Sequence, residues 1–160
     1  MRILSFFALI TIASTLSAQQ TPKNSGDAAY HPDPLSGMYS FLREGEFVEI
    51  DFEEGNQLTG FISRYGDLDS DRGAFLDHTF SKGEHSGEKL SFTTNPVHGV
   101  WFEFKGQVLT DKTKHPGAEG YAEIHGTLIQ YTEDKNKKTT AKSTEVTFKS
   151  FPHDMNAPQP

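Results

Sequence analysis

The chain has 160 residues, with 15 basic against 22 acidic side chains and no cysteine. Its length fits one domain. The net charge of −7 speaks against nucleic acid and anionic membranes as partners, because an acidic surface repels phosphates. The lack of cysteine excludes disulfides, thiol catalysis and a lipid anchor attached through cysteine.

The first 18 residues have the pattern of a secretory signal peptide. A short positive start, Met1-Arg2, precedes an apolar run from Ile3 to Ile12, and small residues follow at 15–18. The run is too short for a stable membrane span. We therefore predict a signal peptide over 1–18 and a secreted or periplasmic protein without a membrane anchor; an uncleaved anchor is the alternative. Loss of Arg2 would leave 14 basic against 22 acidic residues.

Two polar, proline-containing segments flank the remaining chain. Residues 19–34 and 152–160 show no hydrophobic periodicity, so we predict a disordered lead-in and a disordered tail. Between them, 35–151 is expected to form a single β-domain, because no linker composition interrupts it.

That domain alternates apolar and polar residues, which is typical of strands. Val48, Ile50 and Phe52 face one way, and Phe102 and Phe104 do the same farther along. Turn signals separate eight expected strands, at 37–43, 46–53, 57–65, 73–81, 88–94, 98–110, 119–132 and 141–151. Almost every connection has hairpin length, so the fold class is an all-β antiparallel meander. An eight-stranded up-and-down barrel would remove the exposed edges; a two-sheet β-sandwich is the alternative.

One short motif resembles a known family. The stretch LSGMYSF, Leu35 to Phe41, is similar to the glycine-x-aromatic start of the first strand in lipocalin-like and avidin-like barrels, with Tyr39 where those have tryptophan. No helix is expected before the last strand, so the avidin-like meander is closer. The chain also resembles small exported bacterial proteins of unassigned function. The resemblance implies a small β-barrel and carries over no ligand or catalytic residue.

The stretch GDLDSDRGAF is a candidate calcium loop. Asp67, Asp69 and Asp71 occupy alternate positions, as the first ligands of a helix–loop–helix calcium site do. Arg72 then stands where that site needs glycine, and His78 where it needs glutamate. A looser calcium loop between strands remains one interpretation. The other is a turn stabilised by aspartate and serine side chains.

Several histidines and carboxylates are candidates for acid–base chemistry. The seven histidines lack the spacing of a zinc site. A hydrolase or isomerase would use a His–carboxylate pair. The candidate groups are Asp77, His78, His98, Glu123 and His125.

A second set of residues is expected to bind a ligand if the mixed face of the strands lines the interior. This set is Arg64, Tyr65, Trp101, Tyr121, Glu123, His125 and Tyr131. If instead the apolar face is the interior, the aromatic residues of the set lie outside, where they could stack on sugars or a partner protein. The barrel geometry and the resemblance to small ligand-binding barrels make non-catalytic binding of a small or extended ligand, in or on the barrel, the leading functional hypothesis. A small molecule or a carbohydrate is the expected ligand. A structural or adhesion module that uses the exposed aromatics, together with calcium at Asp67, Asp69 and Asp71, is a further alternative.

Overall fold

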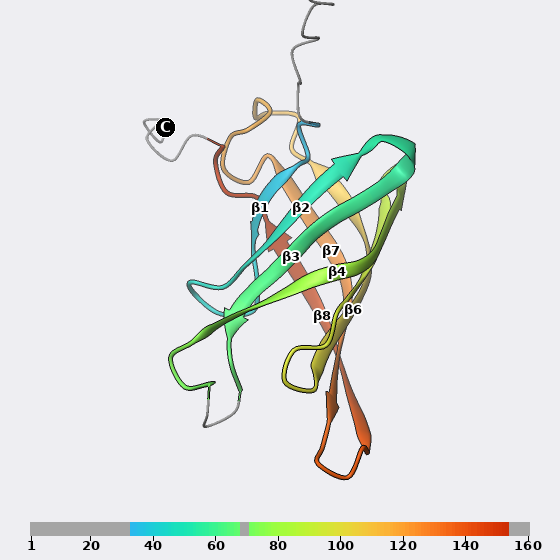
Figure 1. Cartoon of the computed structure of the whole chain (residues 1–160). Helices are drawn as coiled ribbons and strands as arrows, with labels where there is room; N and C mark the ends of the chain where they lie inside the picture. Colours follow the sequence, from blue (N-terminus) through green and yellow to red (C-terminus); the bar gives the residue numbers. More distant parts are fainter. Residues whose placement is uncertain (1–32, 68–70, 154–160) are drawn as a thin grey trace, which may run out of the picture. The chain divides into compact units, whose positions relative to one another are not determined.

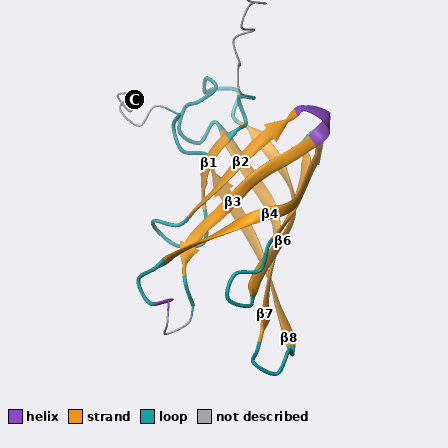
Figure 2. Cartoon of the chain, in the orientation of Figure 1, coloured by secondary structure: helices purple, strands orange, loops and turns teal. Residues whose placement is uncertain are grey.

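The computed structural model describes residues 33–67 and 71–153. They form eight strands in one sheet whose order follows the chain, each antiparallel to the next (Figures 1 and 2). The strands are β1 (Gly37–Ser40), β2 (Phe47–Glu53), β3 (Gln57–Tyr65), β4 (Phe75–Ser86), β5 (Lys89–Thr94), β6 (Val100–Thr110), β7 (Ala122–Glu133) and β8 (Thr139–Lys149), with a short 3-10 turn η1 (Glu54–Asn56) between β2 and β3. The all-β meander prediction is confirmed. The predicted signal peptide, most of the lead-in and nearly all of the tail lie outside the described residues.

The sheet curls until its first and last strands meet. Tyr39 on β1 pairs with Ser150 just after β8, and the Phe151 amide donates to the Met38 carbonyl at 2.9 Å. Contact between these two edges indicates a barrel rather than two packed sheets. Because neighbouring strands are antiparallel, the connections alternate between two ends. We call them the β3–β4 end and the β2–β3 end, after one connection at each.

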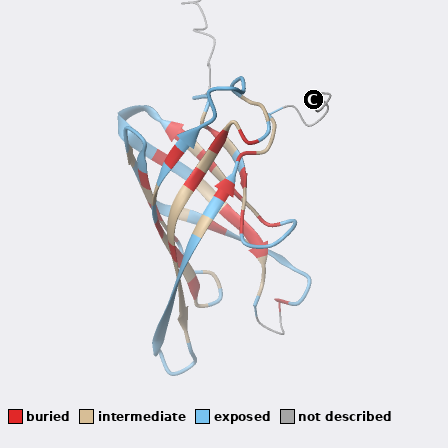
Figure 3. Ribbon diagram, turned by 180° about the vertical axis from the view of Figure 1, so that it is seen from behind, coloured by how far each residue is buried: buried red, intermediate tan, exposed pale blue. Residues whose placement is uncertain are grey.

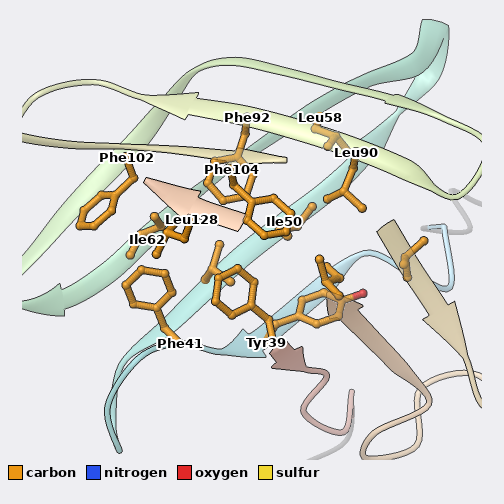
Figure 4. Packing of buried hydrophobic residues seen from close by; sticks show 14 of the residues in the cluster. Tyr39, Phe41, Ile50, Leu58, Ile62, Leu90, Phe92, Phe102, Phe104 and Leu128 are labelled. Carbon is orange, nitrogen blue, oxygen red and sulfur yellow. The ribbon is translucent and has the colours of Figure 1, made fainter. Parts of the chain in front are cut away.

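Apolar side chains on one face of the strands fill the barrel interior. Alternate residues of a strand point to opposite faces, and the buried positions follow this period along β2 and β6. Phenylalanine rings run through the core: Phe92 stacks on Phe104 with centroids 5.2 Å apart, and Phe104 contacts Phe148 at 5.3 Å. Figures 3 and 4 show this buried interior. The apolar face is therefore the inside of the barrel, and the opposite face meets solvent.

Two glycines let β6 and β7 approach beneath a phenylalanine ring. Gly106 pairs directly with Gly126. A Cβ on Gly106 would lie 2.2 Å from the His125 carbonyl oxygen and 2.5 Å from the tip of the Phe104 ring. The aromatic ring covers the backbone that the glycines leave bare.

Replacing Gly106 by alanine should therefore destabilise the protein. A Gly→Ala change in unstrained backbone often stabilises by about 0.4–1 kcal/mol through the unfolded state. Here the new methyl must displace backbone and ring, so we expect a net loss of about 1–3 kcal/mol. Urea unfolding of wild type and Gly106→Ala measures the difference; a more stable variant would refute the close packing.

Strand β4 runs five residues beyond its predicted end at residue 81. The stretch KGEHSG was expected to be a turn, but Gly83 remains in the ladder and Gly87 begins the turn. A Cβ on Gly83 would lie 2.3 Å from the Leu58 carbonyl oxygen, so the glycine serves a close strand contact. Register shifts occur where β4 pairs with β3 and with β5, and such bulges bend a strand.

In the part of the chain that the structure describes, no helix has the length and apolar character needed to cross a membrane.

Candidate functional site

Two basic side chains interrupt the apolar interior at the β3–β4 end. Arg64 follows Ile62 by two residues on β3, and His78 lies opposite Ile62 on β4. Both therefore point inward, where Arg64 is 4% and His78 0% exposed. The ring of the core residue Phe102 contacts both of them. The Arg64 guanidinium carbon lies 5.4 Å, and the centre of the His78 ring 5.2 Å, from the centroid of the Phe102 ring. We call Arg64, His78 and Phe102 the inner polar niche.

The Arg64 guanidinium reaches from this niche towards the surface. Its two terminal nitrogens donate to the two carboxylate oxygens of Asp67 at 2.9 and 2.7 Å. The Gln130 amide also donates to Asp67, at 3.3 Å. The hydrogen bond from Arg64 lowers the pKa of Asp67, so this carboxylate is ionised at neutral pH. Arg64 is thus fixed at one edge of its guanidinium.

The other edge of Arg64 and both nitrogens of His78 have no hydrogen-bond partner among the described residues. The atoms are Nε of Arg64 and Nδ1 and Nε2 of His78, and all three are buried. Burial, with the Arg64 charge adding to it, lowers the pKa of His78 to about 4, against the opposing effect of the Asn95 backbone, which approaches the imidazole outside ordinary hydrogen-bond geometry. The imidazole is therefore neutral at pH 7, with one donor and one acceptor nitrogen. A buried polar group without a partner costs about 1–3 kcal/mol, so a group that satisfied these nitrogens would stabilise the fold.

A second buried charged side chain, that of Glu46, lies at the same β3–β4 end. Glu46 is 2% exposed and accepts hydrogen bonds from the Arg43 side chain at 2.9 Å and the Tyr65 amide at 3.0 Å. The Tyr65 ring packs against Phe75, with centroids 4.3 Å apart. Arg64 and Tyr65, both predicted ligand residues, thus lie on opposite faces of β3.

The predicted metal residues near this end are partly described. Asp67 binds Arg64, and the buried Asp71 lies 3.1 Å from the Nδ1 atom of His98. Asp69 lies outside the described residues. Across the described ranges, no group of three or more His, Asp or Glu side chains is placed to hold a metal ion. Calcium stays a prediction, with its first expected ligand engaged by an arginine.

The remaining predicted ligand residues lie on other parts of the barrel. Trp101 stacks on Tyr131 on the outer face of β6 and β7, with centroids 5.1 Å apart and the planes 8° from parallel. The Tyr131 hydroxyl donates to Glu103 at 2.9 Å, which raises the pKa of Tyr131. The seven predicted residues do not converge on one cavity, and their role in binding stays a prediction. Two others, Glu123 and His125, pair at 3.1 Å on the outer face of β7, while Tyr121 packs against the core.

The stacked pair of Trp101 and Tyr131 should contribute a measurable interaction energy to the free energy of unfolding. Parallel aromatic pairs at this distance are worth about 0.5–1.5 kcal/mol beyond area burial. We expect that coupling energy from a double-mutant cycle of Trp101→Ala and Tyr131→Ala, measured by urea unfolding. Additive losses in the two single variants would mean that the stack does not persist in solution.

The predicted acid–base groups are also dispersed. Asp77 is exposed while its neighbour His78 is buried on the opposite face. The pair of His98 and Asp71 lies at the β3–β4 end, with the His98 side chain 54% exposed. In both His–carboxylate pairs of the described ranges the imidazole is exposed to water, as is usual for ion pairs on a protein surface. Catalysis by these groups stays a prediction.

A hollow with a volume of about 740 Å³ lies at the opposite, β2–β3 end. The turn between β2 and β3, the last part of β4, the start of β5 and Lys105-Gly106 of β6 line it. Figure 1 shows the connection between β2 and β3 close to the last part of β4. None of the predicted ligand residues contributes to the described lining.

Phe102 and Gln130 were not among the predicted site residues, and His78 was expected only as an acid–base group. Strand alternation could have predicted that Arg64 and His78 are candidates for the interior. Leu58 and Ile62 lie on the apolar face of β3, and Arg64 follows Ile62 by two residues, so its charge is expected to point inward. The contribution of Gln130 depends on its register opposite Phe102, which the sequence does not display.

Comparison with known proteins identifies solved structures with a similar fold. No protein-family model and no curated protein matches the sequence. Among solved structures, the apo form of intact afifavidin matches with a TM-score of 0.56 and 13% identity, covering 77% of this chain and 85% of that one. A rhizavidin–biotin complex matches with a TM-score of 0.55 and 12% identity, covering 76% and 96% of the two chains. A complex of short afifavidin with biotin gives 0.54 and 13%, covering 72% and 88%. The described chain therefore has the fold of the avidin-like β-barrels.

Proposed function

We propose that this protein is a non-catalytic binding protein that holds a small molecule at the inner polar niche. The observation that carries the proposal is the set of three buried nitrogens of Arg64 and His78 that make no hydrogen bond of ordinary geometry, although the Asn95 backbone approaches His78. Evolution of a purely structural interior would favour apolar residues at these positions, because unsatisfied buried polar groups destabilise a fold. The biotin complexes of rhizavidin and short afifavidin support a small-molecule ligand for a barrel of this kind.

The chemistry of the niche selects the part of the ligand that enters it. Arg64 Nε can only donate, and a neutral His78 offers one donor and one acceptor. A carbonyl or carboxylate group accepts from both residues at once. The adjacent Phe102 ring favours an apolar body behind that polar group.

A thermal-shift series tests this function. Biotin is the first compound, followed by small carboxylic acids and cyclic amides. A ligand at one hundred times its dissociation constant stabilises by about 2.7 kcal/mol, which raises the melting temperature by several degrees in a domain of this size. We expect such a shift for at least one compound in wild type.

Two matched histidine variants locate the site. In His78→Phe the ring volume is retained and both nitrogens are lost, so the shift should disappear. His125→Phe makes the same change on the outer face, and its shift should equal that of wild type. Equal shifts in both variants, or no shift with any compound, would contradict the proposal.

We also propose that the protein is exported. The support is the signal-peptide pattern of residues 1–18, which lie outside the described residues. Expression with the native amino terminus should give a mature chain that begins near Gln19 in the extracytoplasmic fraction. Intact-mass measurement checks this, and a full-length chain in the cytoplasm would refute it.

A further inference from the structure

Three lysines from neighbouring strands line the hollow at the β2–β3 end. They are Lys82 on β4, Lys89 on β5 and Lys105 on β6. Ser91 lies directly opposite Lys105, and Lys89 is on the same face of β5 as Ser91. Lys89 and Lys105 are therefore diagonal neighbours, about 7–8 Å apart. Two ammonium groups at this spacing can contact one anionic group together.

The hollow is positive although the chain is acidic. Glu84 is the only acid among the described lining residues, and its carboxylate lies 3.4 Å from the Lys82 ammonium group. Three lysines against one glutamate leave an excess of positive charge in a protein whose net charge is −7. A concave surface with charge of one sign concentrates ligands of the opposite sign.

The other lining groups favour a hydroxylated ligand. The side chains of Asn56, Gln57, Ser86 and Ser91 supply amide and hydroxyl groups. His85 also borders the hollow, but its ring packs edge-on against Phe52 of the core at 5.1 Å, so the imidazole faces the interior of the barrel. Lysine ammonium groups bind carboxylate and phosphate as point charges. Amides and hydroxyls in turn exchange hydrogen bonds with sugar hydroxyls.

We propose that this hollow is a second binding site, for a small anionic sugar that carries a carboxylate or a phosphate. Its volume lies within the range of small-molecule sites. It is at the opposite end of the barrel from the inner polar niche, so the two sites use different residues. Failure of one proposal leaves the other intact.

An NMR titration of the folded chain tests this site. The probes are glucuronate and glucose 6-phosphate, with glucose as the uncharged control. We expect amide shifts that saturate for residues of the β4–β5 turn and around Lys105 with at least one of the anionic probes. A response to glucuronate alone assigns a carboxylate ligand, and a response to glucose 6-phosphate alone assigns a phosphate.

Two double variants separate a local site from the overall charge. Lys89→Gln with Lys105→Gln should weaken binding at least tenfold. Lys135→Gln with Lys138→Gln, in the exposed β7–β8 turn, changes the net charge equally and should weaken it less than twofold. All four lysines are exposed, so both proteins should fold, which circular dichroism verifies. No saturable shift with either anion, an equal response to glucose, or equal weakening in both variants would overturn the proposal.

Discussion

Replacing Phe104 with alanine should lower the free energy of unfolding by about 3–5 kcal/mol, the range found when a large core aromatic is truncated. Phe104 is 1% exposed, touches Phe92 and Phe148, and covers the glycine pair between β6 and β7. Its loss would leave a cavity that three strands border. The melting temperature should fall by roughly 10–20 °C.

A matched truncation on the outside gives the scale for this effect. Leu109 lies on the same strand and is 43% exposed, so Leu109→Ala should change stability by less than about 1 kcal/mol. Urea unfolding of both variants yields the comparison. Similar losses in the two would contradict a barrel whose interior is filled by phenylalanine rings.

Acidification should destabilise the protein between pH 6.5 and about 4 because of His78. Its pKa is about 4 in the folded chain against a usual 6.5. In this window the His78 imidazole is protonated in the unfolded chain but stays neutral in the folded chain. The unfolded chain is therefore favoured as the pH falls, and the stability present above pH 6.5 is lost. The slope is about 1.4 kcal/mol per pH unit, and the full loss is about 3 kcal/mol.

Unfolding by urea at several pH values measures this dependence. His78→Phe should remove the slope between pH 6.5 and 4, while His125→Phe should retain it. Subtracting the variant curve removes contributions of other groups, such as Asp51, whose pKa is raised by burial. A slope unchanged in His78→Phe would show that this imidazole is not held neutral in the interior.

The barrel could be predicted from local patterns. The alternation of Val48, Ile50 and Phe52 fixes which face of β2 is buried, and hairpin-length connections fix the order of the strands. The end of β4 was wrong because the role of Gly83 is tertiary. Glycine signals a turn by itself, whereas here it makes room for Leu58 of the neighbouring strand.

The inner polar niche could be predicted only in part. Arg64 was expected to bind a ligand, but together with outer residues such as Trp101 that the fold places elsewhere. The meeting of Arg64, His78 and Phe102 requires the register of three strands, of which β6 is distant in sequence from β3 and β4. Periodicity gives the face of each residue and does not give its neighbours on other strands.

The two ends of the barrel differ in their chemistry. The β3–β4 end buries an arginine and a neutral histidine within the interior, next to an aromatic ring. The β2–β3 end presents lysines around an open hollow. Figure 1 shows that the β2–β3 and β3–β4 connections lie at opposite ends of the strands. Ligands for the two sites therefore need not compete.

The most direct test of the central claim reads the nitrogens of His78 themselves. Long-range ¹H–¹⁵N NMR spectra of the histidine rings would be recorded during titration with biotin and the carboxylic acids, with His78→Phe identifying the His78 signals. The account predicts a neutral imidazole at pH 7 whose ring nitrogen shifts move, and saturate, as a ligand enters the niche. Ring nitrogens that stay unmoved with every compound would contradict it.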